Sequence, residues 1–360
     1  MPEFRPSGYI RPAAQGVPSR EARAQLQLKR LEKINVRQQE ELGRERVPTS
    51  VAAARYATEA WLARDADDWL LIDEGASERV KWDLPSQNGS LYKIQVSWPL
   101  QWTSREGHHD VPVFYAVDGN AMFLTASEAC WRRGSAPHFS GGGLVVAIGY
   151  PLDNHFLFSA RRNYDLTPPS ATSAEGYGGA DGLLDFIDGT LKPFIASTVL
   201  RNSTVGRQAL YGHSFGGLFA LYTLFTRPDL LDCVVASSPS VYWDDFVILS
   251  HEKHFRREAG TAPDGKRPRL MMFYGSYEQA PPQWPGEDDE DYKRRKQGAE
   301  ERAMVDNANA MHERLKACER LCSVTLKGYP DEDHGTVIAC SLSRAVTTFF
   351  EEWHGPKPLA

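Results

Sequence analysis

Short apolar runs recur between residues 78 and 329, and helix-patterned segments separate most of them. The first two runs, 78–84 and 91–98, alternate apolar and polar side chains on either side of Asn88-Gly89. Asn-Gly tolerates the positive φ angles of a type I′ turn, so these two runs are predicted to pair as an antiparallel hairpin. Among the later runs, 111–117 and 144–148 are continuously apolar and are separated by a helix-length segment, which is typical of parallel strands buried on both faces. These later runs cover 111–117, 144–148, 208–211, 233–236, 269–274 and 323–326.

Segments with a helical spacing of apolar residues fill most of the intervals between the later runs. They cover 121–132, 180–196, 215–226, 243–257, 297–318 and 336–353. Strands that alternate with helices in this way predict an α/β domain. We expect a mostly parallel sheet of eight strands with helices on both faces.

The junction between the run at 208–211 and the helix at 215–226 reads Gly212-His213-Ser214-Phe215-Gly216. A G-x-S-x-G sequence also arises by chance, but here an apolar strand precedes it and an apolar-faced helix follows it at once. This context predicts a nucleophile elbow, a sharp strand-to-helix turn that presents Ser214 as a catalytic nucleophile. The sequence therefore predicts an α/β-hydrolase fold with the serine after the fifth strand.

The partners of a catalytic serine follow it along the chain in this fold, first an acid and then a histidine. The serine needs a base to accept its proton, and the imidazole needs a carboxylate to fix its tautomer. Glu278 follows the seventh predicted strand, and His334 follows the eighth. We predict His334 as the base and Glu278 as the acid, with Asp331 and Asp333 as alternatives for the acid.

Backbone N–H groups near the serine are expected to stabilise the oxyanion of the reaction. One donor should be Phe215 N–H at the start of the helix after Ser214. The second is expected from Gly119 or Asn120, because they follow the run at 111–117 and glycine permits a close backbone approach. The alternative is an ordinary turn in which Asp118 forms local hydrogen bonds.

Composition and charge narrow the class of protein. The 360 residues are 41% hydrophobic, which supports a large core, and the net charge of −6 with a pI near 6.0 argues against nucleic-acid binding. No apolar run is long enough to cross a bilayer, and the start lacks a signal-peptide core. The cysteines form a sparse, odd-numbered set that fits reduced thiols in the cytoplasm: Cys130, Cys233, Cys318, Cys322 and Cys340. The pair His108-His109 lacks a third spaced ligand, so we expect no metal or other cofactor.

The first 47 residues differ from the rest, since prolines punctuate their start and a charged, helix-prone string with few apolar residues follows. This composition predicts a flexible extension over 1–47, followed by one catalytic domain over 48–355. Residues 49–72 have the pattern of a helix that docks on the domain. A mitochondrial transit peptide is the alternative for the extension, but serine is scarce and glutamates continue into the helical part.

Several segments occur in the order found in siderophore esterases of the enterobactin-esterase-like family, within the wider esterase D group. They include VFYAVDGN, YGHSFGGLFALY, SSPSVYWDD and DEDHGTV. The chain resembles this family, whose fungal members open ferric triacetylfusarinine, over roughly 91–350. The resemblance implies ester hydrolysis in a hydroxamate or catecholate siderophore, with iron released inside the cell. It places Ser214 and His334 on the family's nucleophile and base, and Arg161 or Arg162 on an arginine that faces the acidic ligand.

A bulky siderophore would need a large pocket with an apolar wall. Met122, Phe123, Tyr242 and Trp243 are candidates for that wall, because they follow strand ends at which this fold builds its site. For Arg161 and Arg162, the alternative to ligand binding is a salt bridge that anchors the turn at 164–168.

Two departures from the family leave the substrate open: the extension over 1–72 has no counterpart that can be aligned, and the segment 279–297 inserts prolines and five consecutive acids after Glu278. An acidic rim at 287–291 would repel an anionic ferric catecholate, although a solvated, disordered loop is the simpler interpretation. A hydrolase of a polyketide ester, lactone or thioester in secondary metabolism is therefore the second hypothesis. A non-catalytic binding module is the third, disfavoured because all three triad positions are filled. The expected partner is a small-molecule ester, with neither nucleic acid nor membrane, and a homodimer stays open.

Overall fold

The computed structural model describes residues 79–87, 89–134, 142–152, 157–172, 174–257 and 266–353. The predicted extension over 1–47 and the predicted docking helix over 49–72 lie outside these residues.

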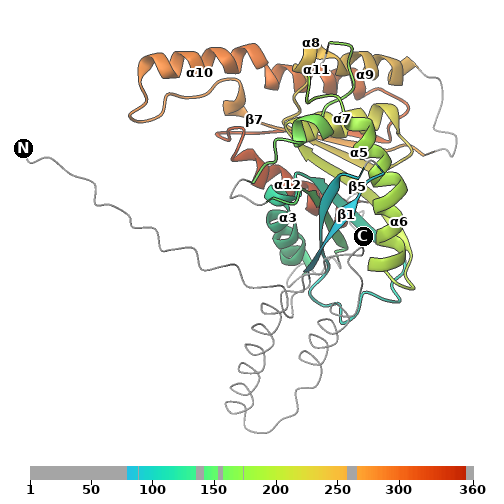
Figure 1. Cartoon of the computed structure of the whole chain (residues 1–360). Helices are drawn as coiled ribbons and strands as arrows, with labels where there is room; N and C mark the ends of the chain where they lie inside the picture. The colour runs from blue at the N-terminus through green and yellow to red at the C-terminus, as the bar shows by residue number, and fades with distance from the viewer. Residues whose placement is uncertain are drawn as a thin grey trace, which may run out of the picture. The chain divides into compact units, whose positions relative to one another are not determined.

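One mixed sheet of eight strands organises the described residues (Figure 1), in the order β1-β2-β4-β3-β5-β6-β7-β8. β2 pairs antiparallel with β1 and with β4, and every other neighbouring pair is parallel. This arrangement confirms the predicted α/β fold and the antiparallel opening pair. The strands are β1 (Arg79–Pro85), β2 (Leu91–Ser97), β3 (Val111–Val117), β4 (Leu144–Gly149), β5 (Val205–His213), β6 (Cys233–Ser237), β7 (Arg269–Gly275) and β8 (Ser323–Tyr329).

Helices cover both faces of the sheet (Figure 1), and each face has its own hydrophobic core. α3 and α12 pack on one face, where the ring of Phe114 in β3 contacts Tyr211 of β5 and Phe349 of α12. The helices between β4 and β5, together with α7, α9 and α11, supply the other core. The α-helices are α3 (Gly119–Gly134), α4 (Arg162–Asp165), α5 (Ala180–Phe186), α6 (Lys192–Phe194), α7 (Phe215–Thr226), α8 (Trp243–Phe246), α9 (Ile248–Arg257), α10 (Asp289–Arg302), α11 (Met304–Leu315) and α12 (Val337–Phe350), and further helical turns are η1 (Ile187–Leu191), η2 (Ile195–Val199) and η3 (Ser276–Glu278).

α7 is the central helix of the second layer and directly follows β5. Its side chains are apolar on all sides, and every residue from Gly216 to Phe225 is buried. A helix that is apolar all round requires burial on all sides, as α7 has between the sheet and α9. The segment that carries the serine is therefore held by the core on both sides of the turn.

Three predictions about local structure were wrong: the turn of the first hairpin, the helix at 297–318 and the loop at 287–291. The first hairpin closes through Ser86 N–H, which donates to Ser90 C=O, so its loop is longer than a two-residue type I′ turn, although Gly89 has φ +80°. The single helix predicted at 297–318 is two helices, α10 and α11, which meet at Ala303 with φ 45°.

The acidic run at 287–291 is also not a disordered loop, because it forms the start of α10. Asp288 is the N-cap and accepts a hydrogen bond from Glu290 N–H, and acidic side chains in the first turn complement the helix dipole. Glu287 is bound by Arg295 at 2.6 Å, and Asp291 pairs with Arg294. Much of the run's charge is thus compensated within α10 itself.

Candidate active site

Ser214 lies on a sharp turn between β5 and α7. Its backbone angles, φ 60° and ψ −118°, are strained for a residue with a side chain. The turn is possible because Gly212 has no Cβ atom. A Cβ atom at this position would overlap the carbonyl oxygen of Gly216. Both ends of the turn are hydrogen-bonded, since Ser214 N–H donates to Ser237 C=O and Leu218 N–H donates to Ser214 C=O. This is the geometry expected of a nucleophile elbow.

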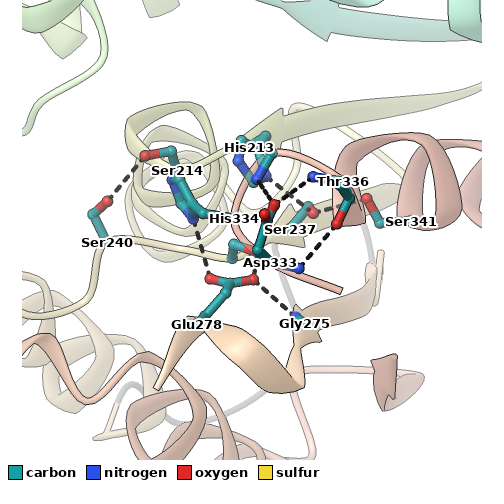
Figure 2. Close-up of polar contacts among 12 residues, drawn as sticks. His213, Ser214, Ser237, Ser240, Gly275, Glu278, Asp333, His334, Thr336 and Ser341 are labelled. Carbon is teal, nitrogen blue, oxygen red and sulfur yellow. Dashed lines mark hydrogen bonds and ion pairs between the residues drawn. The ribbon is translucent and has the colours of Figure 1, made fainter. Parts of the chain in front are cut away.

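The structure brings Glu278 and His334 together from the ends of β7 and β8 (Figure 2). His334 Nδ1 lies 3.1 Å from Glu278 Oε2. The other carboxylate oxygen of Glu278 accepts hydrogen bonds from Ser238 Oγ at 2.5 Å and from Gly275 N–H at 2.8 Å. The Glu278 side chain is 1% exposed, whereas that of His334 is 47% exposed. A buried, fully bonded carboxylate thus holds one nitrogen of an accessible imidazole.

The two alternative acids have other partners. Asp333 Oδ1 accepts N–H bonds from Gly335 and Thr336, both at 2.8 Å, and these bonds hold the pKa of Asp333 below its usual range. Asp331 Oδ1 accepts the Tyr277 hydroxyl at 2.7 Å. Among the described residues, neither carboxylate is hydrogen-bonded to the His334 ring. The geometry therefore favours Glu278 as the acid.

The Ser214 hydroxyl is next to a second hydroxyl in this structure. Ser214 Oγ and Ser240 Oγ are 3.5 Å apart (Figure 2), and no hydrogen bond joins Ser214 to His334 within the described chain. Catalytic hydrogen bonds are often long without substrate and tighten in the complex. Ser238 and Ser240, both on the segment after β6, are site residues that the sequence reasoning missed.

His213 lies behind the His334 ring. The two ring centroids are 4.5 Å apart, and His213 Nδ1 is 3.3 Å from Ser237 Oγ. Ser237 Oγ in turn donates to Ser341 Oγ at 2.8 Å. Ser341 Oγ is also hydrogen-bonded to the Tyr211 hydroxyl, at 2.9 Å. Burial lowers the pKa of His213 well below its usual value, and the nearby His334 and Arg162 lower it further. The ring that supports His334 is therefore uncharged.

This buried histidine predicts a dependence of stability on pH. The unfolded chain takes up a proton at His213 below about pH 6.5, whereas the folded chain does not. The free energy of unfolding should therefore fall as the pH decreases below about 6.5. Its fall should be steeper than in a variant without this group, by about 1.4 kcal/mol per pH unit. Urea unfolding of the wild type and His213→Gln between pH 5 and 8 measures this difference. If the free energy of unfolding depended on pH equally in the wild type and in His213→Gln, His213 would take up its proton in the folded state as it does in the unfolded chain.

The predicted oxyanion donors lie at the starts of two helices. Gly119 and Asn120 begin α3, and Phe215 begins α7. The first N–H groups of a helix have no partner within it and can bind a negatively charged oxygen. The Asn120 side chain is fixed at the end of β4, because its Oδ1 accepts Tyr150 N–H at 2.7 Å and its Nδ2 donates to Tyr150 C=O at 3.0 Å. The two helix starts can thus supply donors from fixed positions.

Both candidate arginines are bound to carboxylates of the protein. Arg162 donates to both oxygens of Asp118, at 2.7 and 2.8 Å. Arg161 pairs with Asp165 at 3.0 Å and donates to Leu91 C=O at 2.8 Å. The salt bridge between Arg161 and Asp165 matches the alternative to ligand binding that the sequence left open. The longer-range pair of Arg162 was not foreseen.

The four residues predicted for the apolar wall separate into two groups. Met122 and Phe123 are 0% and 4% exposed and belong to the core between α3, α12 and the sheet, so they cannot line an open pocket. That prediction was wrong, because the turn of α3 directs these side chains at the sheet. Tyr242 and Trp243 are partly exposed at the start of α8.

An aromatic group lies beside the serine. The ring of Trp243 is 6.4 Å from that of Phe215, and Tyr177 is 6.0 Å from Trp243 and 6.3 Å from Phe215. Tyr177 comes from the segment between α4 and α5, which has no periodic pattern from which this contact could be predicted.

The described residues contain no group of three or more His, Cys, Asp or Glu side chains that could hold a metal ion. The His108 ring stacks on Trp102 at 3.8 Å. Every helix in the described part of the chain is too short or too polar to cross a membrane.

Comparison with known proteins supports the resemblance seen in the sequence. The family described as "Putative esterase" matches residues 63–314. A siderophore triacetylfusarinine C esterase of Aspergillus fumigatus is 48% identical over 271 residues, which are 75% of this chain and 92% of the relative. A siderophore enterobactin esterase of Emericella nidulans is 40% identical over 289 residues, which are 76% of this chain and 95% of the relative.

A solved structure agrees with these relatives. The siderophore hydrolase EstB from Aspergillus nidulans is 45% identical and superposes with a TM-score of 0.74. The match covers 79% of this chain and 100% of the EstB chain.

Proposed function

The chain belongs to the esterase family, and on that premise we propose that it is a serine esterase that hydrolyses ester bonds of a ferric siderophore. The observation that carries the proposal is Ser214 on its strained turn with the Glu278–His334 pair nearby. The substrate class is supported by the two relatives at 48% and 40% identity, whose names give a triacetylfusarinine ester and enterobactin as their substrates. We place the reaction in the cytoplasm, in keeping with the five free cysteines.

The proposed reaction is acyl transfer through Ser214. Glu278 holds His334 Nδ1, which leaves Nε2 to accept the proton of the Ser214 hydroxyl as Oγ attacks the ester carbonyl carbon. The oxyanion is stabilised by Phe215 N–H and by an N–H of Gly119 or Asn120. His334 then protonates the leaving alcohol, and water hydrolyses the acyl-enzyme by the same steps.

Ester cleavage weakens the hold of a siderophore on its iron. A siderophore whose chelating arms are joined by esters binds iron with the effective concentration of linked groups, and cutting the links removes this advantage. The ferric ion is cargo of the substrate, and the protein's part is to bind the ligand and cut its esters. The aromatic group of Tyr177, Phe215 and Trp243 offers an apolar surface for such a bulky substrate.

A substrate panel tests this proposal. Ferric triacetylfusarinine C and ferric enterobactin are incubated with the wild type and with Ser214→Ala, beside a short p-nitrophenyl ester and a polyketide thioester. We expect mass spectrometry to detect linear fragments of at least one ferric siderophore with the wild type alone. We also expect the short ester to be a poor substrate, because it lacks contacts with the aromatic group. Turnover of the thioester with no cleavage of either siderophore would instead support the secondary-metabolite hydrolase.

A further inference from the structure

Asp118 and Arg162 form a buried ion pair next to the proposed oxyanion donors. Asp118 is the one residue between β3 and α3, and its φ angle is 54°. Arg162 Nε and Nη2 donate to Asp118 Oδ1 and Oδ2 at 2.7 and 2.8 Å. The Arg162 side chain is 14% exposed, and the Asp118 side chain is 1% exposed. Two parallel charge-assisted bonds fix the planes of both groups, which a single contact would not do.

The same carboxylate reaches the turn that carries the nucleophile. A Cβ atom placed on Gly216 would lie 3.5 Å from Asp118 Oδ2 and 2.9 Å from the Val117 side chain. The Arg162 guanidinium lies 5.6 Å from the ring of Phe215. The ion pair therefore lies between the start of α3 and the start of α7, the two helix ends with the proposed donors.

The start of α3 is held at two further points. A Cβ atom on Gly119 would come within 2.8 Å of the Gly149 backbone, so this residue packs directly on the end of β4. Asn120 is bonded to both backbone groups of Tyr150. On the side that faces α7, the Arg162–Asp118 pair lies beside the contact between Val117 and Gly216. Loss of that pair would remove the charged contact that fixes the Asp118 side chain on this side, at a residue whose backbone is strained.

We propose that Arg162 is a positioning residue that acts through Asp118: it aligns the amides of Gly119 and Asn120 with that of Phe215 around the oxyanion. This role rests on the proposed serine esterase function. It differs from the role implied by the family resemblance, in which an arginine at this point contacts the acidic part of the ligand. Because Arg162 acts on the oxyanion donors, its loss affects every ester alike, whatever the charge or size of the substrate.

Conservative variants separate the two roles. Arg162→Lys keeps the positive charge but cannot make the bidentate pair, and Asp118→Asn removes the charge of the carboxylate at nearly the same shape. With a short neutral p-nitrophenyl ester, each should lower kcat by about 10²-fold, the usual effect of misplacing one oxyanion donor, and change KM by less than about 3-fold. Affinity for a trifluoromethyl ketone, which mimics the tetrahedral oxyanion, should fall in parallel.

A double variant and a matched control complete the test. Because both residues act as one unit, Arg162→Lys combined with Asp118→Asn should be no slower than the slower single variant. Arg133→Lys disrupts another Arg–carboxylate pair, with Glu351, at the far end of α3. This control is expected to keep the wild-type kcat, since it leaves the helix start in place.

Unchanged kcat and inhibitor affinity on the neutral ester in Arg162→Lys would overturn the inference. A rise in KM confined to anionic siderophores would do the same and would assign Arg162 to the ligand. If the Asp118 variant does not fold, Arg162→Lys alone decides. A wild type that cleaves the neutral ester but no siderophore would refute the substrate proposal, and the neutral-ester comparison would still decide the role of Arg162.

Discussion

Ser214→Ala and His334→Ala are each expected to reduce hydrolysis of a short p-nitrophenyl ester by at least about 10³-fold while the fold stays intact. In the proposed reaction, alanine at 214 removes the attacking oxygen, and alanine at 334 removes the group that accepts its proton. Since the two act as one unit, the double variant should be little slower than either single variant. Steady-state rates, with far-UV circular dichroism for folding, measure this effect.

Ser250→Ala is a suitable control. It removes a hydroxyl that donates to Val247 C=O on the exposed side of α9, and it should keep the wild-type rate. If Ser214→Ala retained activity within a few-fold of the wild type, the nucleophile assignment would be wrong.

Glu278→Gln is expected to lower kcat by roughly 10²-fold, less than the loss of serine or histidine. The carboxylate accepts hydrogen bonds at both oxygens, from His334 on one side and from Ser238 and Gly275 on the other. Glutamine has one acceptor oxygen, so its NH₂ group must face either the histidine or the other two donors. If it faces His334 Nδ1, the ring is driven to the tautomer that cannot accept the proton of Ser214.

Asp331→Asn and Asp333→Asn are the matched comparisons. Both neutralise an acid near His334 without touching its ring, so each should cost less than Glu278→Gln. A wild-type rate in Glu278→Gln together with a large loss in either aspartate variant would move the role of the acid to that aspartate.

The fold could be predicted because its signals are local. Continuous apolar runs such as 144–148 and 233–236 are strands buried on both faces, and the turn at Ser214 needs small residues at fixed offsets. Glu278 and His334 could be located because the order of the strands brings the ends of β7 and β8 to one edge. The start of α10 was missed, although Asp288 followed by acids is a signal for a helix N-terminus.

The remaining features depend on tertiary packing. Met122 and Phe123 follow a strand end, as pocket residues do, but only the rotation of α3 decides that they face the sheet. Asp118 and Arg162 are separated by 44 positions, and no local pattern pairs them. Tyr177 reaches the site from a segment without periodicity.

The assignment of Ser214 as the nucleophile, activated by His334 and Glu278, underlies the whole proposed reaction. Labelling with a fluorophosphonate, followed by peptide mapping in a mass spectrometer, tests it most directly, because the reagent marks only a serine with an activated hydroxyl. We predict a single adduct on Ser214, absent from Ser214→Ala and formed much more slowly in His334→Ala. An adduct on another residue, or no adduct on folded wild-type protein, would contradict the claim.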